Sequence, residues 1–82
     1  MKIEKDNPEY VYYLVGQNLK KLRKQAKLSI VKFANLCNYS EGFIMNIESP
    51  KYLQTFSLDT LWKFSKVLKV DIKYFFQDLD EE

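Results

Sequence analysis

The amino-acid sequence predicts an all-α domain built from five short helices. Apolar side chains recur at spacings of three and four residues along most of the 82-residue chain, which is the period of one helix face. Serine, asparagine or aspartate stands before these patterns, as expected of helix N-caps. The two glycines and two prolines are far apart, and the chain shows no linker that would divide it into two domains.

The first helix is expected to begin near Pro8, because proline is tolerated in a first turn and Asp6 or Asn7 can cap it. Its apolar stripe has spacings of four and three residues: Val11, Val15, Leu19 and Leu22. A cluster of cations closes this helix: Lys20, Lys21, Arg23, Lys24 and Lys27. The cluster suits the negative end of the helix dipole, and two roles stay open, a solvated helix end or contacts to phosphate.

Two short helices follow, over residues 30–37 and 41–49. Ser29 and Ser40 precede them as N-caps, and Asn38 ends the first because asparagine tolerates the left-handed conformation that follows a helix. Two helices joined by so tight a turn are typical of a helix-turn-helix motif.

The fourth helix is expected to begin after Ser57. The side chains expected to face inward are Leu58, Leu61, Trp62, Ser65 and Leu68, and Phe64 is expected at the margin of this stripe. Asp71 is expected to cap a short fifth helix over residues 72–77. Phe75 and Phe76 on that helix should return to the core.

The amino-acid composition weighs against catalysis and against a metal or other cofactor. The chain has no histidine, and its only cysteine, Cys37, lies among apolar neighbours and can form no internal disulfide. The formal net charge is only +2, and four acids crowd the C-terminus: Asp78, Asp80, Glu81 and Glu82. No apolar run approaches the roughly 20 residues of a membrane span. We therefore expect a cytoplasmic binding protein that is not an enzyme, with no membrane partner and no small-molecule ligand.

An ordered set of landmarks between Val15 and Phe76 resembles the Cro and phage-repressor (XRE-like) family of helix-turn-helix domains. The stretch that carries the likeness reads VGQNLKKLRKQAKLSIVKFANLCNYSEGFIMNIESPK, followed by FSLDTLWKFSKVLKVDIKYFF. The resemblance implies a five-helix lambda-repressor-like fold whose third helix enters the major groove of DNA. It divides the chain into an N-terminal extension with the start of helix 1 (1–14), a helix-turn-helix domain (15–77) and an acidic tail (78–82).

The resemblance also implies roles for individual residues. The positions that read bases in this family fall on Glu41, Gly42, Phe43, Met45 and Asn46. The positions that contact the DNA backbone fall on Ser29, Ile30, Lys32, Ser40, Lys51, Tyr52, Gln54 and Thr55. Arg23 and Glu48 occupy the positions of a partly buried structural ion pair.

Departures from the family pattern weaken the expected DNA contacts. Ile30 stands where glutamine often contacts a phosphate, so that only its backbone N–H remains for this purpose. The base-reading positions carry no arginine or glutamine, and Glu41 brings a negative charge towards the phosphates. Such a half-site binds weakly, which favours a homodimer on a palindrome. The candidate dimer residues are Tyr74, Phe75, Phe76 and Leu79, with Tyr10, Tyr12 and Tyr13 as a second choice.

The resemblance therefore implies a sequence-specific transcriptional regulator of bacterial or phage origin, such as a repressor or a restriction–modification controller protein. Its partner would be double-stranded DNA. Two alternatives remain. The scaffold can serve as a protein-interaction module with Glu41, Phe43 and Met45 as the contact patch, or as an antitoxin that represses its own operon.

Overall fold

The computed structural model of the protein describes residues 3–79, and helices are the only regular secondary structure in this part of the chain. They follow in the order α1 (Tyr10–Gln25), α2 (Ile30–Cys37), α3 (Glu41–Glu48), α4 (Leu58–Leu68) and a 3-10 helix, η1 (Ile72–Phe76). The all-α class is confirmed. The expected count of five α-helices is wrong for the described residues, which form four.

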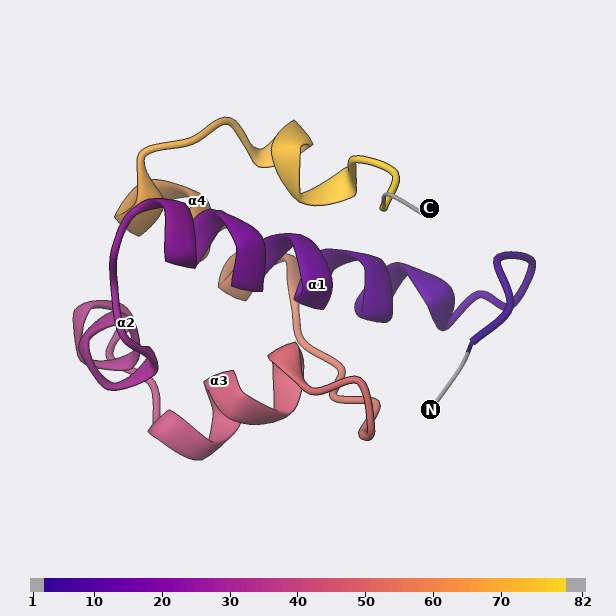
Figure 1. Cartoon of the computed structure of the whole chain (residues 1–82), viewed down its shortest axis with the longest axis horizontal. Coiled ribbons are helices and arrows are strands. Elements are labelled where there is room, and N and C mark those ends of the chain that lie inside the picture. Colours follow the sequence, from indigo (N-terminus) through magenta and orange to yellow (C-terminus); the bar gives the residue numbers. More distant parts are fainter. Residues whose placement is uncertain (1–2, 80–82) are drawn as a thin grey trace.

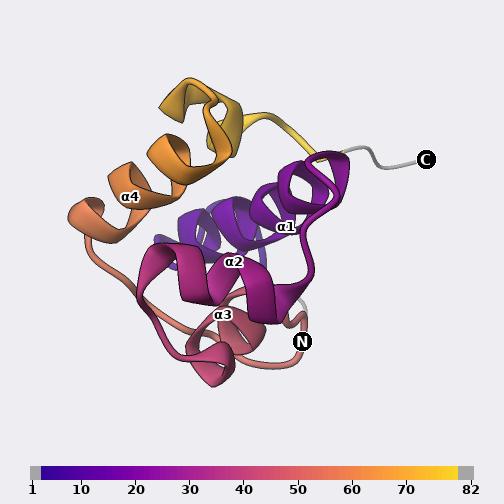
Figure 2. The same cartoon turned by 90° about the vertical axis from the view of Figure 1, so that its left-hand side faces the viewer.

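The longest helix, α1, is the central element of the domain. It runs along the long axis of the molecule with α3 below it (Figure 1), and it contacts α3, α4 and η1. The turned view places α2 and α3 on one side of α1, and α4 and η1 on the other (Figure 2). The domain measures 33 × 24 × 23 Å along its principal axes.

Helix α1 begins two residues later than expected. The Asn7 side chain does accept a hydrogen bond, but from the backbone N–H of Glu9 (2.9 Å), within a set of turns that precedes the helix. The helix ends in a turn in which Lys27 is left-handed (φ 62°), and the Leu28 N–H donates back to the Arg23 carbonyl (3.2 Å). This turn leads into α2, which packs against α3 and α4.

A single hydrophobic core joins all five elements. Its largest fully buried side chains are Phe33, Phe64, Phe75, Leu19, Ile44, Leu61 and Val15. The rings of Phe33 and Phe64 lie 5.4 Å apart between centroids and hold α2 against α4. Burying one such side chain contributes about 1.5–3 kcal/mol to stability. This cluster therefore supplies most of the free energy that favours folding.

The inward face of α4 differs from the expected stripe. Phe64 is wholly buried, whereas Leu58 is 78% exposed and Trp62 is 57% exposed. The buried positions Leu61, Phe64, Ser65 and Leu68 follow the i, i+3, i+4, i+7 spacing of one helix face. Trp62 instead lies beside Lys66, whose ammonium group is 5.2 Å from a ring centroid of the indole.

The last element, the 3-10 helix η1, is tied to α1 through backbone carbonyls at its C-terminal end. The Asn18 side-chain amide, buried in α1, donates to the carbonyls of Phe75 and Gln77, both at 2.9 Å. These bonds bring the chain back onto α1. As a result only Phe75 enters the core, and the expectation that Phe76 would also do so is wrong, because Phe76 is 42% exposed.

Candidate nucleic-acid interface

The helix-turn-helix is built by two serine caps and one left-handed residue. The Ser29 hydroxyl accepts from the Lys32 N–H (3.0 Å) and the Ser40 hydroxyl accepts from the Phe43 N–H (3.1 Å). Asn38 adopts the left-handed conformation (φ 63°) between α2 and α3. Each cap uses an oxygen lone pair, so the O–H of each serine remains available to donate to a phosphate.

The inner face of α3 is fixed to α1 by an ion pair. Arg23 Nε donates to Glu48 Oε2 (2.8 Å) and Arg23 Nη2 donates to Glu48 Oε1 (2.9 Å). Both residues of this bidentate pair are buried. The third donor, Arg23 Nη1, reaches the Leu28 carbonyl (2.6 Å). The hydrogen bond to Glu48 is the main reason why the pKa of Arg23 is raised. The pair lies behind α3 and leaves its outer face open.

A close approach of the two backbones sets the distance between α1 and α3. A Cβ atom at Gly16 would overlap the Ile47 carbonyl oxygen and would come within 3.2 Å of the Ile47 carbonyl carbon. The neighbouring Gln17 amide donates to the Glu48 carbonyl (3.1 Å). Gly16, Gln17 and Asn18 therefore position the motif, although none of them belongs to the sequence patterns that predicted it. Asn18 did carry a signal, because a polar residue within an apolar helical stripe indicates a buried hydrogen bond.

The outer face of α3 brings together four of the five expected base-reading residues. Glu41, Gly42, Met45 and Asn46 are all exposed, Met45 by 50%. Phe43 is placed differently: it is half-buried and its ring lies 5.1 Å from the ring of Tyr39. The helix that carries these residues lies along the lower edge of the molecule in both views (Figures 1 and 2). No other described segment covers these four residues.

The expected backbone-contacting residues border α3 on two sides. At the start of α2, Ser29 and Lys32 are exposed and Ile30 is half-buried, while Ser40 is exposed at the start of α3. In the loop that follows α3, the exposed residues are Lys51, Tyr52 and Thr55. Gln54 is half-buried in this loop, and its side-chain amide donates to the Thr55 carbonyl (2.9 Å). All eight residues thus lie in segments that flank α3 in the chain.

The structure also divides the basic cluster at the end of α1. Lys20 and Lys24 line a shallow groove together with Met45 and Ile30, so they face the same side as α3. Lys21 lines a different groove, beside Tyr74 of η1. With Arg23 engaged by Glu48, only part of this cluster can contribute positive charge near α3.

The four candidate dimer residues do not share one surface. Tyr74 (40%) and Phe76 (42%) are exposed and Leu79 is half-buried, but Phe75 is completely buried and cannot contact a partner. Of the acidic tail, Asp80, Glu81 and Glu82 lie outside the described residues.

Other kinds of site find little support in residues 3–79. No group of three or more acidic, cysteine or histidine side chains is placed to hold a metal ion there. None of the helices in this part of the chain combines the length and apolar character that a membrane crossing requires.

Comparison with known proteins agrees with this geometry. The sequence model of the helix-turn-helix family matches residues 19–75, which include α2, α3, α4 and most of η1. Neither a curated protein nor a solved structure matches the chain significantly. The match covers more than half of the chain and spans the motif described above. The chain therefore belongs to the Cro/C1-type (XRE-like) helix-turn-helix family of DNA-binding domains.

Proposed function

We propose that this protein is a sequence-specific transcriptional regulator that binds a palindromic operator as a homodimer, with α3 in the major groove. The observation that carries the proposal is the outer face of α3, where Glu41, Gly42, Met45 and Asn46 are exposed while the opposite face is anchored in the core. A single helix presented in this way has the width that a major groove admits.

The four exposed residues suit a small number of base contacts. The Asn46 amide can bond adenine through N6 and N7, and the Glu41 carboxylate can accept from the N4 amino group of cytosine. Met45 can pack on a thymine methyl group, and Gly42 lets the helix backbone approach the base edges closely. A good bidentate contact discriminates by about 1–3 kcal/mol, so two of them give modest selectivity.

Phosphate contacts then supply most of the affinity. The serine hydroxyls of both caps, the backbone N–H groups at the start of α2 and the ammonium groups of Lys32 and Lys51 serve this role. Lys20 and Lys24, which share a groove with Met45, offset the repulsion between Glu41 and the DNA. Because each half-site is weak, two subunits on half-sites about one helical turn apart are needed for stable binding.

Selection of bound duplexes from a random DNA pool tests the proposal, followed by titration of three variants against the selected site. Asn46→Ala should relax selectivity at one base position, whereas Lys32→Ala should weaken binding to all sequences alike and lower the salt slope by about one. Lys66→Ala is the matched control, because α4 lies across α1 from α3 (Figure 2). If Asn46→Ala changes neither affinity nor preference, the assignment of base contacts is wrong.

One observation favours a second candidate, a protein-interaction module on the same scaffold. The exposed face of α3 carries no cation, and it combines Glu41 with the apolar Met45. The two functions respond differently to salt. Binding to duplex DNA must weaken steeply as salt rises, because each phosphate contact releases counterions. Failure of any duplex to bind at low salt would favour the protein-interaction module.

A further inference from the structure

A shallow groove lies between α1 and the end of α3, beside the outer face of α3. Lys20 and Lys24 line it from α1, and Met45 lines it from α3. Ile30, the first residue of α2, lines it as well. Because Met45 and Ile30 are among the expected DNA-contacting residues, the groove continues the candidate nucleic-acid interface towards α1.

The groove carries two positive charges that no acidic side chain neutralises. Arg23 and Glu48 also line it, but they neutralise each other through their bidentate pair. Neither Lys20 nor Lys24 forms an ion pair with any other residue that the structure describes. The ammonium groups of these two lysines therefore remain available to an anion.

Helix stability alone does not explain where the two lysines lie. Lys20 and Lys24 are four residues apart on α1, so they are neighbours on one side of the helix, where like charges are destabilising. The helix dipole favours cations in the last turn, which includes Lys24 but not Lys20. Lys20 is also half-buried, so part of its aliphatic chain lies against the domain. An anion bound between the two ammonium groups would relieve their repulsion.

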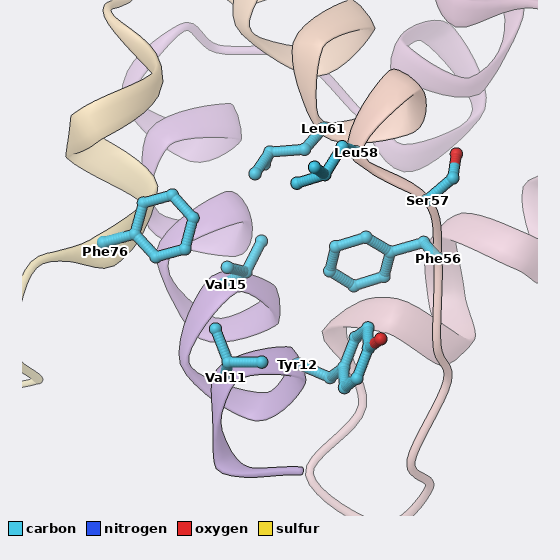
Figure 3. Close-up of a pocket in the computed structure, with 8 residues that line it drawn as sticks. All are labelled: Val11, Tyr12, Val15, Phe56, Ser57, Leu58, Leu61 and Phe76. Carbon is cyan, nitrogen blue, oxygen red and sulfur yellow. The ribbon is translucent and has the colours of Figure 1, made fainter. Parts of the chain in front are cut away.

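Two other hollows of the domain have a different chemistry. The recess between α1, the start of α4 and η1 is lined by apolar side chains such as Val11, Phe56 and Phe76, and no charged side chain lines it (Figure 3). The groove between α1 and η1 has a single cation, Lys21, which lies beside Tyr74. Of these three hollows, only the groove next to Met45 combines two cations with residues of the candidate interface.

We propose that Lys20 and Lys24 bind a phosphate of the DNA backbone at the edge of each half-site, so that α1 contacts DNA in addition to α2, α3 and the loop that follows α3. This contact rests on the proposed function, because it requires α3 to lie in the major groove. When Met45 faces the base edges, the adjoining groove faces the sugar–phosphate backbone on the side of α1. The contact supplies positive charge that α3 lacks. Since phosphates carry no sequence information, it strengthens binding to all sequences alike.

The test measures the affinity for random-sequence duplex by fluorescence anisotropy, at salt concentrations from about 50 to 200 mM. The groove variant, Lys20→Gln with Lys24→Gln, removes both charges. The matched control, Lys21→Gln with Lys66→Gln, removes the same net charge outside the groove, because Lys21 faces η1 and α4 lies across α1 from α3 (Figure 2). Glutamine and lysine have similar helix propensities, so the circular-dichroism spectra should not change.

The expected result is a change in the salt dependence of the groove variant alone. Each phosphate contact contributes about 0.9 to the slope of log K against log[salt], so the groove variant should lose about two from this slope per bound chain. Its deficit in affinity relative to the wild type should shrink about 10-fold across the salt range. The control should keep the wild-type slope. Ethylation of the phosphates next to α1 on the selected operator should hinder the wild type and not the groove variant.

The outcomes separate this inference from the proposed function. A loss of slope confined to the groove variant, with an unchanged circular-dichroism spectrum, supports the contact. A groove variant that keeps the wild-type slope, or a control that loses as much, overturns the contact and leaves the proposed function standing. A wild type that does not bind duplex in a salt-dependent manner refutes the proposed function and the contact together.

Discussion

The same substitution, glycine to alanine, should have opposite effects at the two glycines of this protein. At Gly16 the new methyl group would overlap the Ile47 carbonyl oxygen, a backbone atom of α3 that cannot rotate away. At Gly42 nothing lies within 4 Å of the added Cβ. Both residues are helical, so both substitutions also gain the higher helix propensity of alanine, up to about 1 kcal/mol each.

The magnitudes follow from these contacts. Forcing extra atoms into a packed site costs about 1–3 kcal/mol, and separating α1 from α3 would also strain the bond from Gln17 to the Glu48 carbonyl. We expect Gly16→Ala to destabilise the protein by about 2 kcal/mol net, which lowers the Tm of a domain this small by about 8–16 °C. Gly42→Ala should instead raise the free energy of unfolding by about 0.5–1 kcal/mol.

Urea unfolding followed by circular dichroism measures both changes, and titration with the selected operator gives a second result. On the proposed function, Gly42→Ala should bind DNA more weakly although it is more stable, because its methyl group would stand between the α3 backbone and the base edges. A Gly16→Ala variant as stable as the wild type would refute the claim that backbone contact sets the distance between α1 and α3. Unchanged operator affinity of Gly42→Ala would refute the close approach of Gly42 to DNA.

Three further predictions follow from buried polar groups. Arg23→Ala leaves the buried Glu48 carboxylate without its partner and should lower the free energy of unfolding, measured in urea, by about 3–5 kcal/mol. The double variant Arg23→Met with Glu48→Leu removes both charges and should recover much of that loss. Asn18→Ala leaves the Phe75 and Gln77 carbonyls without their donor and should cost about 1–3 kcal/mol, with faster amide hydrogen exchange in η1 than in α2. Burial raises the pKa of Cys37 from 9.0 to about 11, so the folded state keeps the thiol neutral while the unfolded state ionises. Stability should therefore decline as the pH rises from about 9 towards 11, and less so in a Cys37→Ala variant.

Local signals predicted the helix-turn-helix well because each depends on a few neighbouring residues. Ser29, Ser40, Ser57 and Asp71 all accept the expected cap hydrogen bonds, and Asn38 is left-handed as expected. The orientation of α4 could not be predicted in this way. Apolar side chains occur on more than one of its faces, and only packing against α2 and η1 decides that Phe64 rather than Trp62 turns inward.

The location of the candidate site was easier to predict from the sequence than the burial and orientation of its side chains. The outer face of α3 follows from helix periodicity, but the half-burial of Phe43 depends on its contact with Tyr39 from the preceding turn. The division of the basic cluster depends on where α1 passes α3 and η1. That arrangement is fixed by Gly16, Gln17 and Asn18, whose partners lie about 30 to 60 residues away in the sequence.

The anchoring of α3 through Ile44, Ile47 and Glu48 separates the residues that hold this helix from the residues that face outward. The outward residues contribute little to folding, so they are free to mutate without loss of the native state. On the proposed function, a lineage can therefore retarget the protein to a new operator through a few substitutions at solvent-facing positions. The same separation makes the domain a suitable scaffold for engineering altered sequence preference.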